Sequence, residues 1–291
     1  MPHPFAYFAK GWESTNSTWR IIIPTEPDAP ESPSSVQVSF SLRIGEGTLN
    51  ASLAVPAGKT TLTELLPILQ DFDSGLIDRV IVEATAEDHP VSCRAGCGAC
   101  CRQMVPLSIF EAEFLGEWFN RLPPERQAEL EERFHRGLSR LKEAGVLDKI
   151  LDPNWGLDEK SFIQMAVDYF HAGVPCPFLE NESCSIHPIR PLVCREYLVT
   201  SPAELCQDPS INQISAIHLP LKPSQALYKI GQELTHDVKG WMPLIFLLAW
   251  SKRGLKPGDY YSGTGQEVLR IFMENLTTEP PAEGATMMQP G

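Results

Sequence analysis

All eight cysteines of this 291-residue chain lie between positions 93 and 206, and four of them fall within nine residues. This first group is a C-x3-C-x2-C-C array with the sequence Cys93-Arg-Ala-Gly-Cys97-Gly-Ala-Cys100-Cys101. The remaining four are Cys176, Cys184, Cys194 and Cys206. Two residues between cysteines allow one tight turn to present both thiolates to a metal ion, and Gly96 and Gly98 suit a turn that needs positive φ. The pattern therefore predicts that two distant stretches of chain converge on bound metal.

The length and the apolar stretches of the chain limit the other roles that these cysteines could have. A chain of this length buries a sizeable core without covalent crosslinks. The start, Met1-Pro-His-Pro-Phe-Ala, has no basic stretch followed by an apolar run, so no secretory signal is predicted. The most apolar stretch, residues 242–250, is far shorter than the ~20 residues of a membrane span. We therefore expect a cytoplasmic protein that does not enter membranes, with cysteines that ligate metal or react.

Buried free cysteines and structural disulfides are the alternative interpretations. A buried free cysteine behaves as a small hydrophobic residue, which explains neither the adjacent pair Cys100–Cys101 nor the glycines beside it. Disulfides are rare in a reducing cytoplasm. Because adjacent side chains are expected to point apart, one of this pair is predicted to serve a second metal, another iron of a cluster or a redox role. A nucleophilic Cys–His pair, Cys184 with His187, stays open, although the crowding of thiols favours metal ligation.

Charge narrows the choice of partners and points to four arginines. The chain has 37 acidic and 24 basic residues, a formal net charge of −13, which argues against nucleic acid and anionic membranes as general partners. Four thiolates around a divalent zinc, or around an iron–sulfur cluster, leave an anionic centre. Four arginines adjoin or approach the cysteines in sequence: Arg94, Arg102, Arg190 and Arg195. We expect them either to neutralise the centre and donate to sulfur, or to lie as solvated surface residues.

Hydrophobic periodicity predicts an α+β fold, mainly helical, with an N-terminal β-hairpin. Apolar residues alternate over 36–44 and 49–55, which is typical of two strands with one buried face. Ser108 and Glu111 fit a capping box, and Pro123-Pro124 opens a further helix. The expected helices lie near residues 62–69, 107–118, 124–141, 162–173, 224–235, 243–253 and 265–276, with a short strand at 217–221.

The same patterns divide the chain into five segments. Residues 1–35 and 278–291 are predicted to be disordered, the first because of its many prolines. Residues 36–90 are expected to form a hairpin-plus-helix subdomain. Residues 91–206 are predicted to be the cysteine-cluster metal-binding domain, with a loop-rich metal site, and residues 207–277 a helical extension.

Four cysteine-containing segments, taken together, resemble a known family. They are residues 93–102, Cys176-Pro-Phe-Leu, Cys184-Ser-Ile-His-Pro-Ile-Arg-Pro and Cys194-Arg-Glu-Tyr. In this combination they are similar to the CxxCxxCC cysteine-cluster family (YkgJ-type), which is described as zinc- or iron-chelating. The resemblance covers residues 91–206 and implies metal binding. It includes no motif around Cys206, and the position of His187 is often tyrosine in the family, so His187 is not counted as a ligand.

Two main classes of function follow for such a metal-binding protein. In the first, the cysteines hold an iron–sulfur cluster or iron with a redox, oxidoreductase-like role, which is favoured because eight thiols exceed one closed four-thiolate site. In the second, the metal is structural zinc, its binding supplies folding free energy on the order of 10 kcal/mol, and the module meets a protein partner. The cysteine region is also similar to that of flagellin lysine methylases, which implies a protein-modifying enzyme, but no glycine-rich nucleotide fingerprint supports it. The spacing alone does not select the metal.

Overall fold

The structure is a computed structural model that describes residues 34–44, 47–152, 155, 159–235 and 239–277. Within these residues the chain is mainly helical and carries small antiparallel sheets, which confirms the expected α+β class. The strands are β1 (Ser35–Ile44), β2 (Gly47–Pro56), β3 (Lys59–Thr61), β4 (Pro106–Ser108), β5 (Leu179–Glu180), β6 (Ser183–Cys184), β7 (Trp241–Pro243) and β8 (Ser262–Thr264). The α-helices are α1 (Leu62–Ala86), α2 (Ile109–Asn120), α3 (Pro124–Glu143), α4 (Leu147–Leu151), α5 (Glu159–His171), α6 (Leu192–Glu196), α7 (Pro223–Thr235), α8 (Leu247–Ser251) and α9 (Gly265–Thr277).

Short 3-10 helices supplement these elements. They are η2 (Ala99–Arg102), η3 (His187–Ile189), η4 (Ala203–Gln207), η5 (Leu244–Phe246) and η6 (Pro257–Tyr260). Residues 1–33 and 278–291 lie outside the described residues, so the disorder predicted for the two ends of the chain stays a prediction. Among the described residues, no helix is long and apolar enough to cross a membrane.

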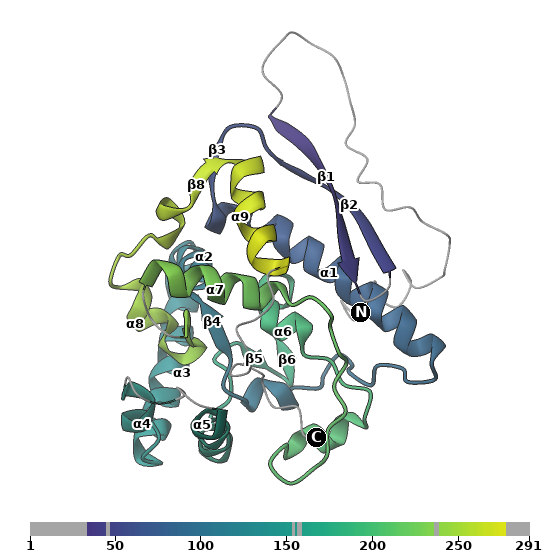
Figure 1. Ribbon diagram of the computed structural model, residues 1–291. Coiled ribbons are helices and arrows are strands. Elements are labelled where there is room, and N and C mark those ends of the chain that lie inside the picture. The colour runs from purple at the N-terminus through teal and green to yellow at the C-terminus, as the bar shows by residue number, and fades with distance from the viewer. Residues whose placement is uncertain (1–33, 45–46, 153–154, 156–158, 236–238, 278–291) are drawn as a thin grey trace, which may run out of the picture. The chain divides into compact units, whose positions relative to one another are not determined.

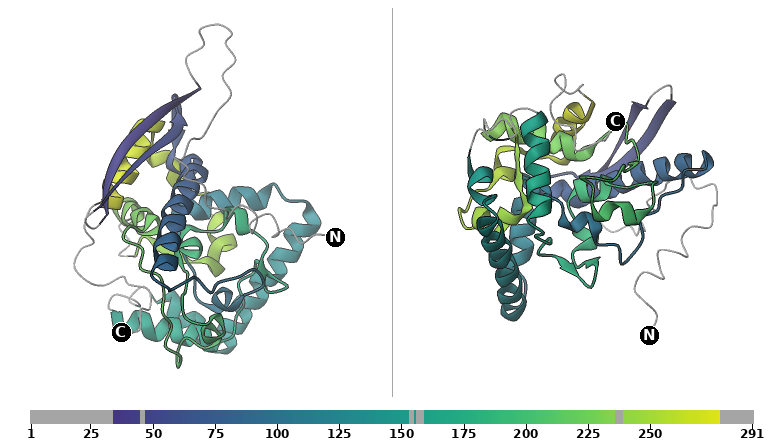
Figure 2. Two further views of the ribbon diagram at one scale, coloured as in Figure 1. Left: turned by 90° about the vertical axis from the view of Figure 1, so that its right-hand side faces the viewer. Right: turned by 90° about the horizontal axis from the view of Figure 1, so that it is seen from below.

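Strands β1 and β2 form the hairpin that the alternating pattern predicts. They pair antiparallel along their whole length, with Val36 opposite Val55 and Leu42 opposite Leu49. The hairpin packs beside α1 and α9 (Figures 1 and 2). Leu42, Leu53 and Val55 are buried and belong to the main apolar core, which extends to α9. The alternation in sequence therefore marks a single buried face.

Helix α1 joins the hairpin to the cysteine-rich region. The hydroxyl of Thr61 accepts a hydrogen bond from the N–H of Glu64 at 3.1 Å, and the Glu64 carboxylate accepts from the N–H of Thr61 at 2.9 Å. From Leu62 to Ile77 the helix contributes a stripe of buried apolar side chains, and it continues to Ala86. It contacts α2, α6 and α9. One side of the cysteine-rich region therefore rests on this helix.

The capping box predicted for α2 is confirmed, and its glutamate has a second contact. Ser108 Oγ accepts from the N–H of Glu111 at 3.2 Å, and Glu111 Oε2 accepts from the N–H of Ser108 at 3.0 Å. Glu111 Oε1 accepts from the N–H of Leu192, the first residue of α6, at 2.7 Å. The Glu111 side chain is buried. One carboxylate therefore joins the starts of two helices that are 81 residues apart in sequence.

The other expected helices are present, with one difference in form. α3 begins at Pro124, and the chain leaves α5 through Gly173, which has a φ of +63°. Helices α7 and α9 lie at the predicted positions. The expected helix at 243–253 begins as the 3-10 turn η5 and continues as α8.

The strand predicted at 217–221 is wrong. Ile217 and Leu219 are buried in a small apolar cluster with Ile77 of α1. In the described part of the chain, this segment is paired only at its start, by an isolated bridge between Val199 and Ala216 and a hydrogen bond from the Ile217 N–H to the Leu198 carbonyl at 2.8 Å. The alternation of apolar residues reflects burial of one side of an extended segment, and burial alone does not make a strand without a partner backbone.

We predict that Glu111→Gln lowers the free energy of unfolding by about 1–3 kcal/mol at pH 8, because an amide NH2 would face a buried backbone N–H and leave both without an acceptor. Urea denaturation measures this change. Glu64→Gln is the matched control, since Glu64 holds the same capping-box position in α1 but is exposed. Equal losses in the two variants would show that the bond to α6 contributes nothing.

Candidate metal centre

Five of the eight cysteines line one cavity. Cys100 and Cys101 come from η2, Cys176 from the turn before β5, Cys184 from β6 and Cys194 from α6. The cavity has about 670 Å³ of empty space, including the part open to solvent. Most of the rest of its wall is apolar. The structure thus brings thiols from both stretches of sequence to one place.

A backbone contact holds the two stretches together. The N–H of Cys176 donates to the carbonyl of Cys101 at 2.7 Å. Beside it, Gly98 approaches the β5–β6 hairpin so closely that a Cβ would lie 2.6 Å from Glu182 Oε2 and 2.7 Å from Leu179 Cδ1. The absence of a side chain at Gly98 therefore leaves the space that the β5–β6 hairpin occupies.

The two glycines of the cysteine array have different roles. Gly96 has a φ of +81°, which confirms the expected need for positive φ. Gly98 has a φ of −90°, so the same expectation is wrong there. The sequence shows that a glycine is present, but the reason for it at position 98 lies in a segment more than 80 residues away.

An ion pair supports the hairpin that carries Cys184. Arg102 donates to both carboxylate oxygens of Glu182, at 2.7 and 3.0 Å. Glu182 and its neighbour Asn181 form the turn between β5 and β6, with φ values of +57° and +49°. Such a turn matches the twist of a hairpin, but positive φ strains a glutamate. Arg102 thus compensates for strain in the turn that places Cys184.

The remaining three cysteines gather around η4. Cys206 is buried in a small apolar cluster against which Cys97 packs. Cys93 Sγ accepts from the N–H of Val199 at 3.4 Å. Burial, together with the charges of Cys93 and Cys97, raises the pKa of Cys206 to about 11. These three thiols are therefore neighbours, although in the described structure they do not line the five-cysteine cavity.

Cys100 connects the two groups of thiols electrostatically. Its charge contributes to raising the pKa of both Cys93 and Cys206. It acts in the same direction on three thiols of the cavity: Cys176, Cys184 and Cys194. Cys100 therefore lies within electrostatic range of both groups.

The expectation that Cys100 and Cys101 point apart is wrong. Both line the cavity, and a hydrogen bond between their thiols lowers the pKa of Cys100 and raises that of Cys101. The cause is the local helix. In a 3-10 turn, successive side chains diverge by only about 120°, which lets both thiols reach one cavity.

The thiols are gathered but not yet closed around an ion. All eight cysteines are free. Among the described residues, no three Cys, His, Asp or Glu side chains are arranged to hold a metal ion. The donor chemistry fits zinc, iron or an iron–sulfur cluster, which all bind thiolates. Loading would require thiols to turn into the cavity, and a cysteine side chain turns by rotation about χ1 between staggered positions.

Burial disfavours the thiolate form of most of the cavity thiols. It raises the pKa of Cys176 to about 12 and that of Cys194 well above the usual range. The pKa of Cys184 is raised for the same reason. A metal ion would supply the positive charge that lets these thiols ionise, so binding would release protons.

The four arginines divide into one that faces the cavity and three that hold the surrounding structure. Arg190 lines the cavity, and its charge helps to lower the pKa of Cys100 and offsets part of the rise that burial causes in the pKa of Cys184. Arg102 pairs with Glu182 as described above. Arg94 pairs with Glu204 of η4 at 2.6 Å on the surface.

Arg195 turns toward the helix that supports α6. It donates to the carbonyl of Arg190 at 3.2 Å and to Ser74 Oγ of α1 at 3.2 Å. Arg195 does not line the five-cysteine cavity in the described structure. Its contacts are those of a residue that fixes the segment around Cys194.

Sequence reasoning missed a buried cluster of charged groups next to this region. Asp73 of α1 is fully buried, and neither carboxylate oxygen has a hydrogen-bond partner. The charges of Arg190, Arg195 and Glu196 all act on its pKa. Glu196 is buried too and accepts from the N–H of Ser224 at 2.7 Å. The available signal was the position of Asp73 on the apolar stripe of α1.

One comparison with known proteins finds a match. Residues 92–214 match the CxxCxxCC family model, described as "Putative zinc- or iron-chelating domain". The match covers less than half of the chain and confirms the family resemblance that the cysteine motifs predict. It includes Cys206, which the motifs alone did not. No curated protein and no solved structure matches the chain.

Gly98→Ala tests the close approach of the two stretches. We predict a loss of about 1–3 kcal/mol in the free energy of unfolding, because the added methyl group meets the backbone of Glu182 at 3.2 Å as well as two side chains. Gly75→Ala in α1 is the matched control, since a Cβ there meets nothing within 4 Å. The control is expected to be neutral or slightly stabilising. A neutral Gly98→Ala would contradict the packing described.

Asp73→Asn tests the buried carboxyl through pH. Burial and then the charge of Glu196 raise the pKa of Asp73 to about 9. The folded state thus favours the protonated form, and its contribution to stability is present below about pH 4 and lost as pH rises toward 9. We predict that Asp73→Asn gains stability relative to the unmodified protein as pH rises from 5 to 8.5, by about 1.4 kcal/mol per pH unit and up to about 5 kcal/mol in all, measured by urea denaturation.

The control for this experiment is Asp71→Asn, on the exposed side of the same helix. Its stability relative to the unmodified protein is expected to be the same at both pH values. Any pH dependence of metal binding is common to all three proteins and cancels in these differences. A difference for Asp73→Asn that does not change with pH would show that Asp73 is ionised in the folded state.

Proposed function

We propose that residues 93–206 hold zinc or iron through cysteine thiolates, with the principal centre in the five-cysteine cavity. The main support is that five thiols from two stretches of sequence surround one cavity. The family match supports zinc or iron chelation. Sulfur donors favour zinc, iron and iron–sulfur clusters over magnesium or calcium, which prefer oxygen.

We assign four cavity thiols to this principal centre. They are Cys101, Cys176, Cys184 and Cys194. Cys93, Cys97 and Cys206, with Cys100 between the groups, would form a second and more exposed centre. The separate clustering of these thiols around η4 supports this division.

The first proposal for the bound group is an iron–sulfur cluster or iron, and structural zinc is the second. Such an iron centre would supply one-electron transfer. The chain would provide Arg190 to offset the negative charge of the thiolates and an apolar wall to limit access of water. Zinc is supported by the position of the centre between two distant stretches of chain, where a tetrahedral ion would hold them together. With either kind of metal centre, the cysteines must stay reduced, which requires a reducing compartment such as the cytoplasm.

Cys184→Ser and Cys206→Ser distinguish the two proposed centres. Anaerobic purification followed by analysis of iron, zinc and acid-labile sulfide gives the metal content of each variant. We expect Cys184→Ser to lose most of the metal of the principal centre, because Cys184 lines the cavity and is one of the four thiols assigned to that centre. Cys206→Ser is expected to keep that centre. Full metal content in Cys184→Ser would contradict the ligand set.

The same purification separates the two proposals for the bound group. Brown protein with iron and acid-labile sulfide supports the redox role. Colourless protein with one or two zinc ions supports the structural role. Protein without either metal, purified from cells supplied with both, would contradict metal binding itself.

A further inference from the structure

A second cavity adjoins the five-cysteine cavity. It has about 520 Å³ of empty space, including the part open to solvent. Gln103, Met104 and Tyr197 line both cavities. Gln103 and Met104 follow Cys101 closely in sequence, and Tyr197 follows Cys194 by three residues. The wall between the cavities is therefore built by the same short segments that place the thiols.

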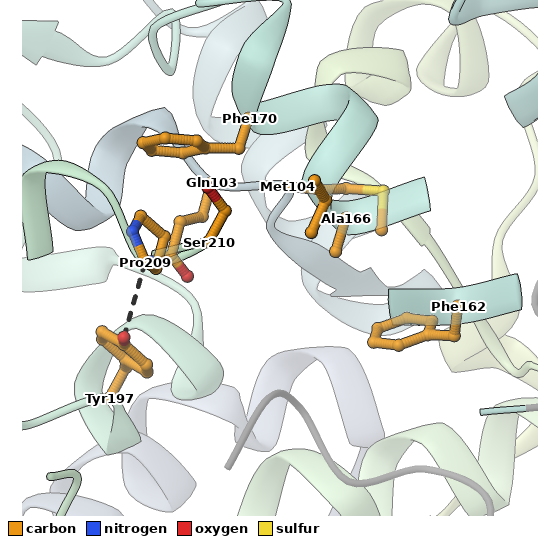
Figure 3. Close-up of a pocket in the computed structure, with 9 residues that line it drawn as sticks. Gln103, Met104, Phe162, Ala166, Phe170, Tyr197, Pro209 and Ser210 are labelled. Atoms are coloured by element: carbon orange, nitrogen blue, oxygen red, sulfur yellow. Dashed lines mark hydrogen bonds between the residues drawn. The ribbon is translucent and has the colours of Figure 1, made fainter. Parts of the chain in front are cut away.

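The second cavity is mainly apolar, and three aromatic rings line it. Figure 3 shows the rings of Phe162 and Phe170 on either side of Met104 and Ala166. None of the lining residues that the structure describes carries a charge. Aromatic rings pack well against other rings and against the methionine thioether. The lining thus favours a neutral ligand with a flat apolar body.

Polar groups are confined to two edges of this cavity. The Gln103 amide donates to the Tyr197 hydroxyl at 3.4 Å, a long hydrogen bond that a ligand could replace with a better one (Figure 3). Both groups belong to the wall shared with the thiols. Ser210 is already bound to Asp208 at 2.5 Å. A ligand's polar group would therefore find its partners at the wall nearest to the thiols.

We propose that this cavity binds a small neutral aromatic molecule, a single ring with one hydroxyl group, with the hydroxyl at Gln103 and Tyr197. Apolar pockets with a few convergent polar groups are typical of small-molecule sites, and a single flat ring can pack against the aromatic rings that line this cavity. Binding itself needs only the described residues. The further statement that the ligand lies next to a metal centre rests on the proposed function.

The test uses 4-methylphenol as the probe and full-length protein in the metal state in which it is purified. The protein carries 13C-labelled methionine methyl groups, and Met104→Leu assigns the Met104 signal. We expect a saturable shift of the Met104 methyl signal, caused by the ring current of the probe, with a Kd on the order of 0.1–1 mM for so small a ligand. Met273 of α9, which does not line the cavity, is the internal control.

Ala166→Leu fills the cavity and is expected to weaken binding at least about tenfold. Ala128→Leu, on the exposed surface of α3, is the matched control and is expected to bind as the unmodified protein does. Gln103→Leu is expected to reduce the preference for 4-methylphenol over toluene by about 2–10-fold, the contribution of one hydrogen bond. No saturable shift of Met104, or equal binding by Ala166→Leu and Ala128→Leu, would overturn the proposal.

Metal analysis of the same samples separates this proposal from the proposed function. Ala166→Leu is expected to contain as much metal as the unmodified protein. Probe binding to a protein that holds no metal would support the ligand site and contradict the metal centre. Normal metal content without probe binding would support the metal centre and contradict the ligand site.

Discussion

The metal-binding region depends on one close backbone approach, between the turn that carries Cys100 and Cys101 and the segment that carries Cys176 and Cys184. A hydrogen bond of 2.7 Å from the Cys176 N–H to the Cys101 carbonyl connects them. Beside this bond, Gly98 leaves room for the β5–β6 hairpin. Without this approach the thiols of the two stretches would not share a cavity.

Charge is the second constraint. The cysteines of the cavity are half-buried, and desolvation raises the pKa of most of their thiols, so the protein without a cation holds them mainly as neutral thiols. Behind them the chain also buries the carboxyls of Asp73, Glu111 and Glu196. Because buried anions need nearby cations or hydrogen-bond donors, Arg190 acts both on the thiols and on Asp73, and Arg195 acts on the carboxyls of Asp73 and Glu111. A bound metal ion would add the positive charge that the thiolates require.

Local signals in the sequence predicted local structure well. The alternation of apolar residues predicted the hairpin, the Ser108–Glu111 pair predicted the start of α2, and Pro124 predicted the start of α3. These features depend on residues a few positions apart, so a single sequence contains them. The cysteine motifs likewise predicted the family, because their spacing is itself the signal.

Features that depend on distant segments could not be predicted. The partner of Glu111 is 81 residues away, and the reason for Gly98 lies in the hairpin around Glu182. The division of the thiols into two groups depends on where η4 packs, and the spacing of the cysteines in the sequence does not contain this information. The apolar pattern at 217–221 was misleading because a strand needs a partner backbone, and burial against α1 produces the same alternation.

The two segments that place thiols share a pattern that links the centre to the second cavity. In each, the cysteine is followed by an arginine that turns toward the surrounding structure: Arg102 to Glu182, and Arg195 to Ser74 of α1. Within three residues of the cysteine, each segment then contributes side chains to the wall between the cavities, Gln103 and Met104 from one and Tyr197 from the other. A rotation of either segment that changed the position of its thiol would also move this wall. Any ligand bound against the wall would therefore be sensitive to the state of the thiols, and the thiols to the ligand, since such coupling is reciprocal.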